Sequence, residues 1–213
     1  MQITWNDLNA TPDTGENADT VLARSYEISD TPGEEYLQQR NIPSGVALEA
    51  QVRYTPNFNS RPAVLAPLRN DQGQLMAVHG RYIQHIGKQT RMLTIGYPSG
   101  VFTVLKGLES DPLILVEGLF DALSLAACGV PCIATIGRWI EWLPGFHPHH
   151  TIILAFDGNK SGDAAADYFT KQANKIKLLR LRPPGRCKDW NTTLNKIGVR
   201  SLTRWLSENI IKG

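Results

Sequence analysis

The sequence has few cysteines and no long apolar run. It contains three cysteines among 213 residues, and this small odd number indicates reduced thiols rather than a disulfide framework. No set of four cysteines and histidines has the spacing of a zinc site. No apolar run approaches the roughly 20 residues that a membrane helix needs, and the first residues lack the regions of a secretory signal. These absences favour a cytoplasmic protein with no membrane partner.

The charge is small overall but unevenly distributed. The formal net charge is +2, yet residues 1–50 hold nine acids and two bases, whereas residues 160–213 hold twelve lysines and arginines and four acids. A basic segment of this kind is typical of a phosphate-binding surface, and it is also typical of an ordinary solvated face. Charge alone therefore leaves both interpretations open.

The N-terminal half of the chain predicts an acidic arm followed by a small α+β subdomain. Residues 1–33 are polar and turn-rich without sustained periodicity, which predicts a mobile arm with at most a short helix. Residues 34–108 begin with a short predicted helix and continue with β-rich segments. Two of these segments flank the turn sequence of residues 70–73 and form a predicted hairpin. On its second strand, period-two alternation places His79 and Arg81 on the same face.

After residue 108 the chain alternates short apolar runs with helical segments. This alternation predicts an α/β domain over residues 109–197, in which helices flank a parallel four-stranded sheet with right-handed crossovers. The apolar runs are expected to be strands buried on both faces. The strands are expected at residues 112–116, 131–135, 151–156 and 176–181. Residues 198–213 are expected to form a C-terminal amphipathic helix.

Acidic residues follow two of the predicted strands. Glu117 follows the first strand and Asp157 follows the third, each with a glycine after it. In open α/β sheets, functional groups gather at the carboxyl ends of the strands. Carboxylates that converge there repel one another, and their oxygen atoms favour Mg²⁺ or Mn²⁺ over zinc. The local pattern is equally consistent with a helix-capping glutamate and a simple turn at Asp157.

Four segments, in order along the chain, resemble motifs of the Toprim domain in bacterial DnaG-type primases and phage or plasmid primases. Residues 113–123 resemble the first Toprim motif, in which a glutamate ends a strand and an aspartate follows four residues later. Residues 132–137 resemble the next strand end. Residues 152–165 are similar to the Asp-x-Asp-x-x-Gly motif and its helix, and residues 182–191 to a Pro-Gly-x-Lys-Asp-x-Asn segment. With weaker upstream likenesses, the resemblance spans most of residues 34–195.

The resemblance implies a metal-dependent nucleic-acid enzyme and assigns roles to individual residues. It implies catalytic roles for Glu117, Asp121 and Asp157. It implies Mg²⁺ or Mn²⁺ binding by Glu117, Asp157 and Asn159, where Asn159 replaces the second aspartate of the family and weakens the expected site. Contacts with nucleic acid or nucleotides are expected from Arg81, Lys88, Arg91, Lys160, Lys188 and Asp189. For the basic residues, an ordinary exposed cation is the alternative interpretation, as is a pair between Lys188 and Asp189.

The leading hypothesis is a primase-like nucleotidyl transferase core that acts on a single-stranded DNA template. Its expected partners are single-stranded DNA, nucleoside triphosphates and a replication helicase or other replication protein. The alternatives are a Toprim nuclease that cleaves phosphodiesters, and a non-catalytic nucleic-acid-binding accessory protein in which Asn159 marks a weakened site. The length argues against a topoisomerase, and it leads us to expect a stand-alone protein, for example from a mobile element, or part of a larger machine.

Overall fold

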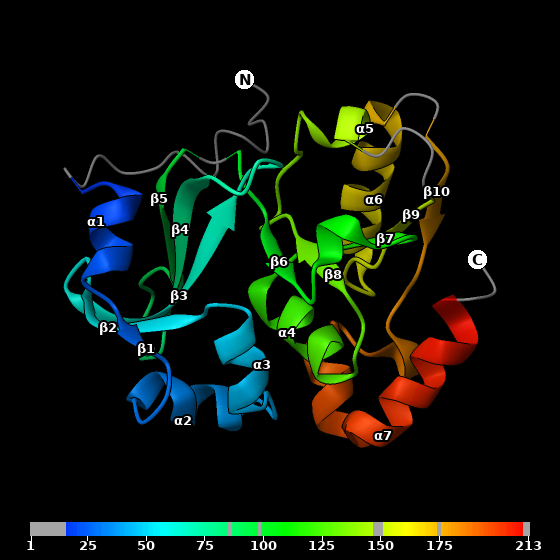
Figure 1. The fold of residues 1–213 in the computed structure, drawn as a ribbon. Coiled ribbons are helices and arrows are strands. Elements are labelled where there is room, and N and C mark those ends of the chain that lie inside the picture. Colours follow the sequence, from blue (N-terminus) through cyan, green and yellow to red (C-terminus); the bar gives the residue numbers. More distant parts are fainter. Residues whose placement is uncertain (1–15, 85–86, 98, 147–150, 174–175, 211–213) are drawn as a thin grey trace.

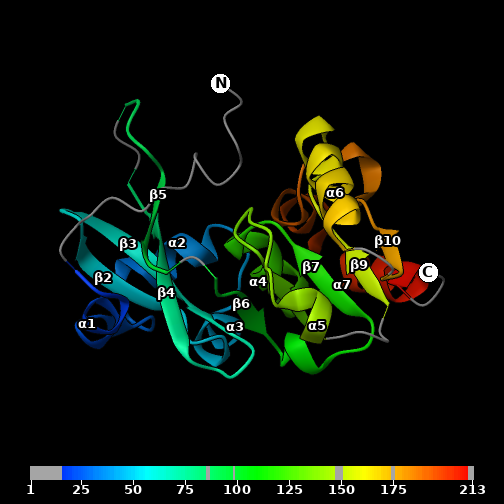
Figure 2. The same ribbon diagram turned by 90° about the horizontal axis from the view of Figure 1, so that it is seen from above.

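The computed structural model describes residues 16–84, 87–97, 99–146, 151–173 and 176–210 (Figure 1). Two subdomains lie side by side, as the view from above also shows (Figure 2). The helices are α1 (Ala18–Ala23), α2 (Pro32–Gln38), α3 (Ser44–Glu49), α4 (Leu119–Ala127), α5 (Leu143–Phe146), α6 (Lys160–Gln172) and α7 (Trp190–Ile210). The strands are β1 (Tyr26–Glu27), β2 (Arg53–Phe58), β3 (Arg61–Arg69), β4 (Leu75–Tyr82), β5 (Met92–Gly96), β6 (Phe102–Val104), β7 (Leu113–Val116), β8 (Cys132–Ala134), β9 (Ile152–Leu154) and β10 (Leu178–Arg180). Among the described helices, none has both the length and the apolar character needed to cross a bilayer.

The N-terminal subdomain is built on an antiparallel sheet with the strand order β1-β2-β3-β4-β5. The predicted hairpin is confirmed, because β3 and β4 pair antiparallel on either side of the predicted turn. In this turn the side chain of Asn70 accepts hydrogen bonds from the N–H groups of Gln72 and Gln74. Gly73 adopts a φ of 77°, a conformation that glycine tolerates better than other residues.

Residues 16–33 are folded, although the sequence predicts them as part of a mobile arm. They form α1, β1 and the start of α2. Val21 of α1 packs into the same buried cluster as residues of β3 and β4, and Ile28 is fully buried in a second cluster. These isolated apolar residues have no local periodicity, so only their tertiary contacts reveal that the segment is ordered. The remainder of the predicted arm, residues 1–15, lies outside the described residues.

The second sheet confirms the predicted α/β class. Its strand order is β10-β9-β7-β8-β6, and the four predicted strands β7 to β10 run parallel. A fifth strand, β6, pairs antiparallel with β8. The sequence placed this segment within the N-terminal subdomain, because three residues are too few to show a periodic pattern.

Helices cover both faces of the second sheet (Figure 1). Ile114 and Val116 point into the cluster that contains buried residues of α4 and α7, whereas Leu113 and Leu115 point into the cluster with α5 and α6. The first cluster also includes residues of α2, α3 and β3, so the two subdomains share one core. We expect this shared core to hold the subdomains in a defined relative orientation.

The C-terminal helix starts earlier than the sequence predicts. Helix α7 begins at Trp190 and is interrupted at Gly198, whose backbone has φ 76° and ψ 164°. The predicted amphipathic helix corresponds to the segment after this interruption, where Leu202 and Leu206 are buried. Residues 211–213, the end of this predicted helix, lie outside the described part of the chain.

Candidate active site

Glu117 and Asp157 meet at the carboxyl ends of two adjacent parallel strands. Glu117 follows β7 directly, and Asp157 follows β9, which pairs with β7. In the sheet β7 lies between β8 and β9, and the chain crosses from β8 over to β9 on the other side of β7, so this is the point where the strand order reverses. The N–H of Asp157 donates a hydrogen bond to Oε1 of Glu117 at 2.9 Å. The two acids that the sequence singled out therefore lie side by side.

Burial and repulsion from a neighbouring acid disfavour the charged form of each of the two acids. The pKa of Glu117 is raised mainly by burial and also by the nearby charge of Asp157. The pKa of Asp157 is raised mainly by burial and then by the charge of Asp189. A bound cation would reverse both effects, because it favours the charged form of each carboxylate.

Asp121 lines the same cavity as these two acids and joins two helices. It occupies the first turn of α4, and its Oδ1 accepts hydrogen bonds from the N–H groups of Trp190 (2.9 Å) and Asn191 (3.4 Å) at the start of α7. Burial, followed by repulsion from Asp157 and Asp189, raises the pKa of Asp121 to about 8. Its position suits orientation of the first acidic motif.

The loop before α7 contributes a further acid and a base. Both Lys188 and Asp189 line the same cavity as Glu117. Oδ1 of Asp189 accepts a hydrogen bond from the N–H of Thr192 at 2.7 Å, which makes Asp189 the N-cap of α7. No ion pair joins Lys188 to Asp189 within the described residues. The charge on Asp189 lies close enough to Asp157 to raise the pKa of that carboxyl group.

Asn159 contacts Asp157 but uses its carbonyl oxygen elsewhere. Its Oδ1 accepts a hydrogen bond from the N–H of Gly162 at 3.0 Å and caps α6. Its Nδ2 donates to Oδ2 of Asp157 at 3.2 Å. The Asn159 oxygen that was expected to bind a cation therefore accepts a hydrogen bond from the first turn of α6, and the Asn159 amide nitrogen donates a hydrogen bond to the Asp157 carboxylate. The next residue, Lys160, is exposed and lies outside the lining of the cavity.

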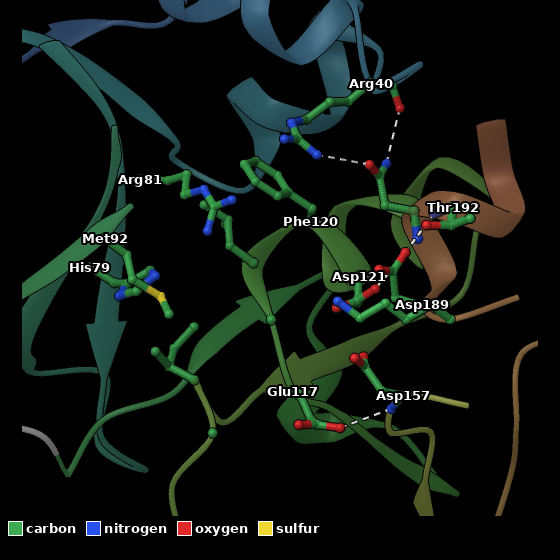
Figure 3. Close-up of a pocket in the computed structure, with 16 residues that line it drawn as sticks. Arg40, His79, Arg81, Met92, Glu117, Phe120, Asp121, Asp157, Asp189 and Thr192 are labelled. Atoms are coloured by element: carbon green, nitrogen blue, oxygen red, sulfur yellow. Dashed lines mark hydrogen bonds between the residues drawn. The ribbon is translucent and has the colours of Figure 1, made fainter. Parts of the chain in front are cut away.

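A cavity of about 360 Å³ separates these acids from the N-terminal subdomain. The acids line one wall, and the opposite wall carries Arg40, His79 and Arg81 (Figure 3). The cavity is therefore acidic on the Toprim-motif side and basic on the hairpin side. Phe120 of α4 reaches the basic wall, between the two arginines (Figure 3).

The two arginines of the basic wall differ in their contacts. Arg40 stacks on Phe120 at 4.1 Å from the ring centroid and donates hydrogen bonds to Oδ1 of Asn191 (3.2 Å) and to the hydroxyl of Tyr36 (3.0 Å). Arg81 lies 5.6 Å from the same ring, and within the described residues the buried Nε atoms of both arginines have no hydrogen-bond partner. Within the described residues Arg81 also has no ion pair. Arg81 is therefore available to an anion, whereas Arg40 ties the subdomains together.

Two predicted basic residues lie outside the cavity, and one residue that was not predicted lines it. Lys88 and Arg91 are exposed between β4 and β5, outside the cavity lining. His79 was not predicted as a site residue, although strand alternation had placed it on the face of Arg81. His79 is buried, and its Nδ1 lies 2.9 Å from Oγ1 of Thr94. Burial, followed by the charges of Arg138 and Arg81, lowers the pKa of His79 to about 3, so the imidazole is neutral.

The acids fit a magnesium ion that draws its remaining ligands from water and substrate. Within the described residues, no group of three or more histidine, cysteine, aspartate or glutamate side chains is close enough to hold a metal ion. However, Glu117, Asp157 and Asp189 all line one cavity. Mg²⁺ is typically bound by one or two carboxylates together with waters and phosphates, so a closed protein cage is not required.

Family models match both halves of the chain. Residues 114–194 match a model described as Toprim-like, and residues 12–96 match a model described as Domain of unknown function (DUF7146). A search of curated proteins finds no match. The predicted resemblance is confirmed, and the second half of the chain is a Toprim-like domain.

Solved structures share the arrangement of both subdomains. The zinc-binding and RNA polymerase domains of the Aquifex aeolicus primase match with a TM-score of 0.67 and 17% identity, over 89% of this chain and 59% of that chain. This chain therefore spans less than two thirds of that protein. The RNA polymerase domain of Mycobacterium tuberculosis primase DnaG matches with a TM-score of 0.69 and 16% identity, over 90% and 81% of the two chains. A DnaG primase catalytic domain bound to ssDNA matches with a TM-score of 0.67 and 17% identity, over 89% and 76%. The chain thus has the fold of primase catalytic cores.

Proposed function

We propose that this protein is a primase-like nucleotidyl transferase core that acts on a single-stranded DNA template with Mg²⁺ or Mn²⁺. The observation that carries the proposal is the cavity whose two walls have opposite charge. Glu117 and Asp157 are joined by a hydrogen bond on one wall, and Arg81, which has no ion pair among the described residues, lies on the other. A metal-bound nucleotide is an anion with an attached cation, so it complements such a cavity on both sides. The fold shared with a DnaG domain bound to ssDNA supports the choice of template.

The acidic wall would hold the metal. Carboxylate oxygens of Glu117 and Asp157 would be the donors, with the remaining ligands from water and phosphate, and Asp121 would orient the first motif through its bonds to α7. A bound magnesium ion would neutralise phosphate charge and align the phosphates with a 3′-hydroxyl. Oε1 of Glu117 accepts a hydrogen bond from the Asp157 N–H, so Oε2 would either bind the metal or, where Asp157 holds the metal, accept the hydroxyl proton.

The basic residues would bind phosphates at two locations, inside the cavity and on the exposed surface outside it. Arg81 and Lys188 line the cavity and would contact the nucleotide. Lys88, Arg91 and Lys160 are exposed outside the cavity and would contact the backbone of the template. Contacts of the second kind are sequence-independent and weaken as salt increases.

A primer-synthesis assay tests the proposal. The protein is incubated with single-stranded DNA, nucleoside triphosphates and Mg²⁺ or Mn²⁺, and we expect short oligonucleotides as products. Glu117→Gln and Asp157→Asn should lower the yield by about 100-fold or more, because each removes a charge that stabilises the reacting groups. Arg81→Gln should also lower it, whereas Arg200→Gln, on an exposed face of α7, is the matched control and should not.

The same reactions distinguish the alternatives. Cleavage of labelled DNA without synthesis, with loss of cleavage in Asp157→Asn, would identify a nuclease. DNA binding that is unchanged in Asp157→Asn, together with neither synthesis nor cleavage, would identify a non-catalytic accessory protein. Either result would overturn the proposed primase activity.

A further inference from the structure

Arg180 binds the backbone of the segment that leads from β9 into the candidate active site. It is the last residue of β10, and 17% of its side chain is exposed. Its Nη1 donates hydrogen bonds to the carbonyl oxygens of Leu154 (3.1 Å) and Phe156 (2.8 Å). Its Nη2 donates to the carbonyl oxygen of Asp157 at 2.5 Å. One guanidinium group therefore binds three carbonyl oxygens of this segment, the last of which belongs to Asp157.

The guanidinium group of Arg180 donates hydrogen bonds to backbone carbonyls beyond the point where the backbone bonds between β9 and β10 end. The last backbone bond between the two strands joins the N–H of Leu181 to the carbonyl oxygen of Leu154 at 3.1 Å. Beyond it, no backbone N–H of the described residues reaches the carbonyl oxygens of Phe156 or Asp157. Carbonyl groups that are removed from water need such partners. The fork of donors in arginine can satisfy several of them at once, which a lysine ammonium on its single stem does less well.

The same side chain reaches the start of α6. Nη2 of Arg180 lies 3.3 Å from Oδ1 of Asp163 in the first turn of that helix. Asp163 also pairs with Arg182 at 2.8 Å, but Arg182 is 56% exposed, and all of its hydrogen bonds within the described residues are to Asp163. Arg180 of β10 thus contacts both the segment that follows β9 and the first turn of α6, whereas the side chain of Arg182 bonds, among the described residues, only to α6. This difference makes Arg182 a matched control.

We propose that Arg180 is a positioning residue that fixes the backbone at Asp157 and so aims its carboxylate and its N–H at the metal and at Glu117. The metal part of this inference rests on the proposed function, but the backbone part does not. The positive charge acts in the same direction, because its attraction opposes the rise in pKa at Glu117 and Asp157. Residues that orient a metal-binding side chain typically change metal affinity by about 10- to 100-fold when replaced.

Two measurements on the whole chain test the proposal. Hydrogen–deuterium exchange reports backbone order in residues 154–159, with peptides of β3 as an internal reference. Titration with Mn²⁺ alone reports metal affinity. We expect Arg180→Met to speed exchange in residues 154–159 by about tenfold with β3 unchanged, and to weaken Mn²⁺ binding by about tenfold or more. Arg182→Gln should leave both measurements at wild-type values.

Arg180→Lys separates the charge from the hydrogen-bond fork. We expect it to recover part of the Mn²⁺ affinity but little of the protection of residues 154–159. If residues 154–159 exchange at the wild-type rate in Arg180→Met or in Arg180→Lys, the proposal is overturned. It is also overturned if exchange becomes equally faster in β3, because Arg180 would then contribute only to general stability. Absence of Mn²⁺ binding in the unmodified protein would instead overturn the proposed function, while the exchange data would still decide the role of Arg180.

Discussion

Replacement of Asp121 by asparagine should stabilise the protein at alkaline pH. The Asp121 carboxylate is buried and accepts hydrogen bonds from the N–H groups of Trp190 and Asn191. Asparagine presents an oxygen to the same two donors but carries no charge. The hydrogen bonds to the start of α7 are therefore retained, while the titration of this position is removed.

The expected magnitude follows from the pKa of Asp121. Burial and the neighbouring acids raise this pKa from 3.8 to about 8. The native state therefore keeps a proton that the unfolded chain has lost, so the contribution to stability is full below pH 3.8 and decreases as the pH rises to about 8. The complete shift corresponds to about 6 kcal/mol. Relaxation and entry of water reduce such penalties, and we expect about 2–4 kcal/mol at pH 8.5.

Urea unfolding followed by tryptophan fluorescence measures the effect. EDTA is present throughout, so that no cation offsets the charge. The free energy of unfolding of Asp121→Asn should exceed that of the wild type by about 2–4 kcal/mol at pH 8.5 and lie within about 1 kcal/mol of it at pH 4.5. Groups that do not interact with Asp121 titrate alike in both proteins and cancel in the difference. Asp167→Asn, which makes the same substitution at an exposed position of α6, is the control.

Two outcomes would refute this reasoning. A difference between Asp121→Asn and the wild type that is the same at both pH values would show that Asp121 does not take up a proton on folding. A variant that is less stable at pH 8.5 than the wild type would show that the ionised Asp121 carboxylate is a better hydrogen-bond acceptor for the start of α7 than the asparagine amide.

Three further predictions concern the surrounding structure. Trp190→Phe should lower the free energy of unfolding by about 2–4 kcal/mol, because it removes a 2.7 Å hydrogen bond to a buried carbonyl and leaves unfilled space; a cost no greater than that of the partly exposed Trp205→Phe would contradict this. Gly80→Ala should cost about 1–3 kcal/mol in thermal unfolding, because the new methyl group would overlap a buried phenylalanine ring, whereas Gly45→Ala has open space around it and should cost nothing. The His79 imidazole should stay neutral from pH 8 to pH 5 in nitrogen NMR spectra, because its pKa is lowered to about 3. Its contribution to stability is then lost as the pH falls below 6.5, and an NMR titration near that pH would count against the assigned burial.

Much of the α/β domain could be predicted because its signals are local. Strands β7 to β10 are short apolar runs separated by helical segments, and this pattern needs no knowledge of distant residues. Strand β6 and residues 16–33 give no such signal. Three residues of β6 are too few to show periodicity, and α1 and β1 are ordered through isolated apolar side chains that find partners only after folding.

By itself, the sequence determined that Glu117 and Asp157 follow two strands of one sheet, and the order of the motifs predicted their common site. The tertiary structure decided which groups surround them. It directs the Asn159 oxygen to a helix cap, brings Asp189 to face Asp157, and places Arg180 against the backbone of Asp157. The position of an acid at the end of a strand is a local property. Its hydrogen-bond partners and charged neighbours come from distant segments, and only packing brings these together.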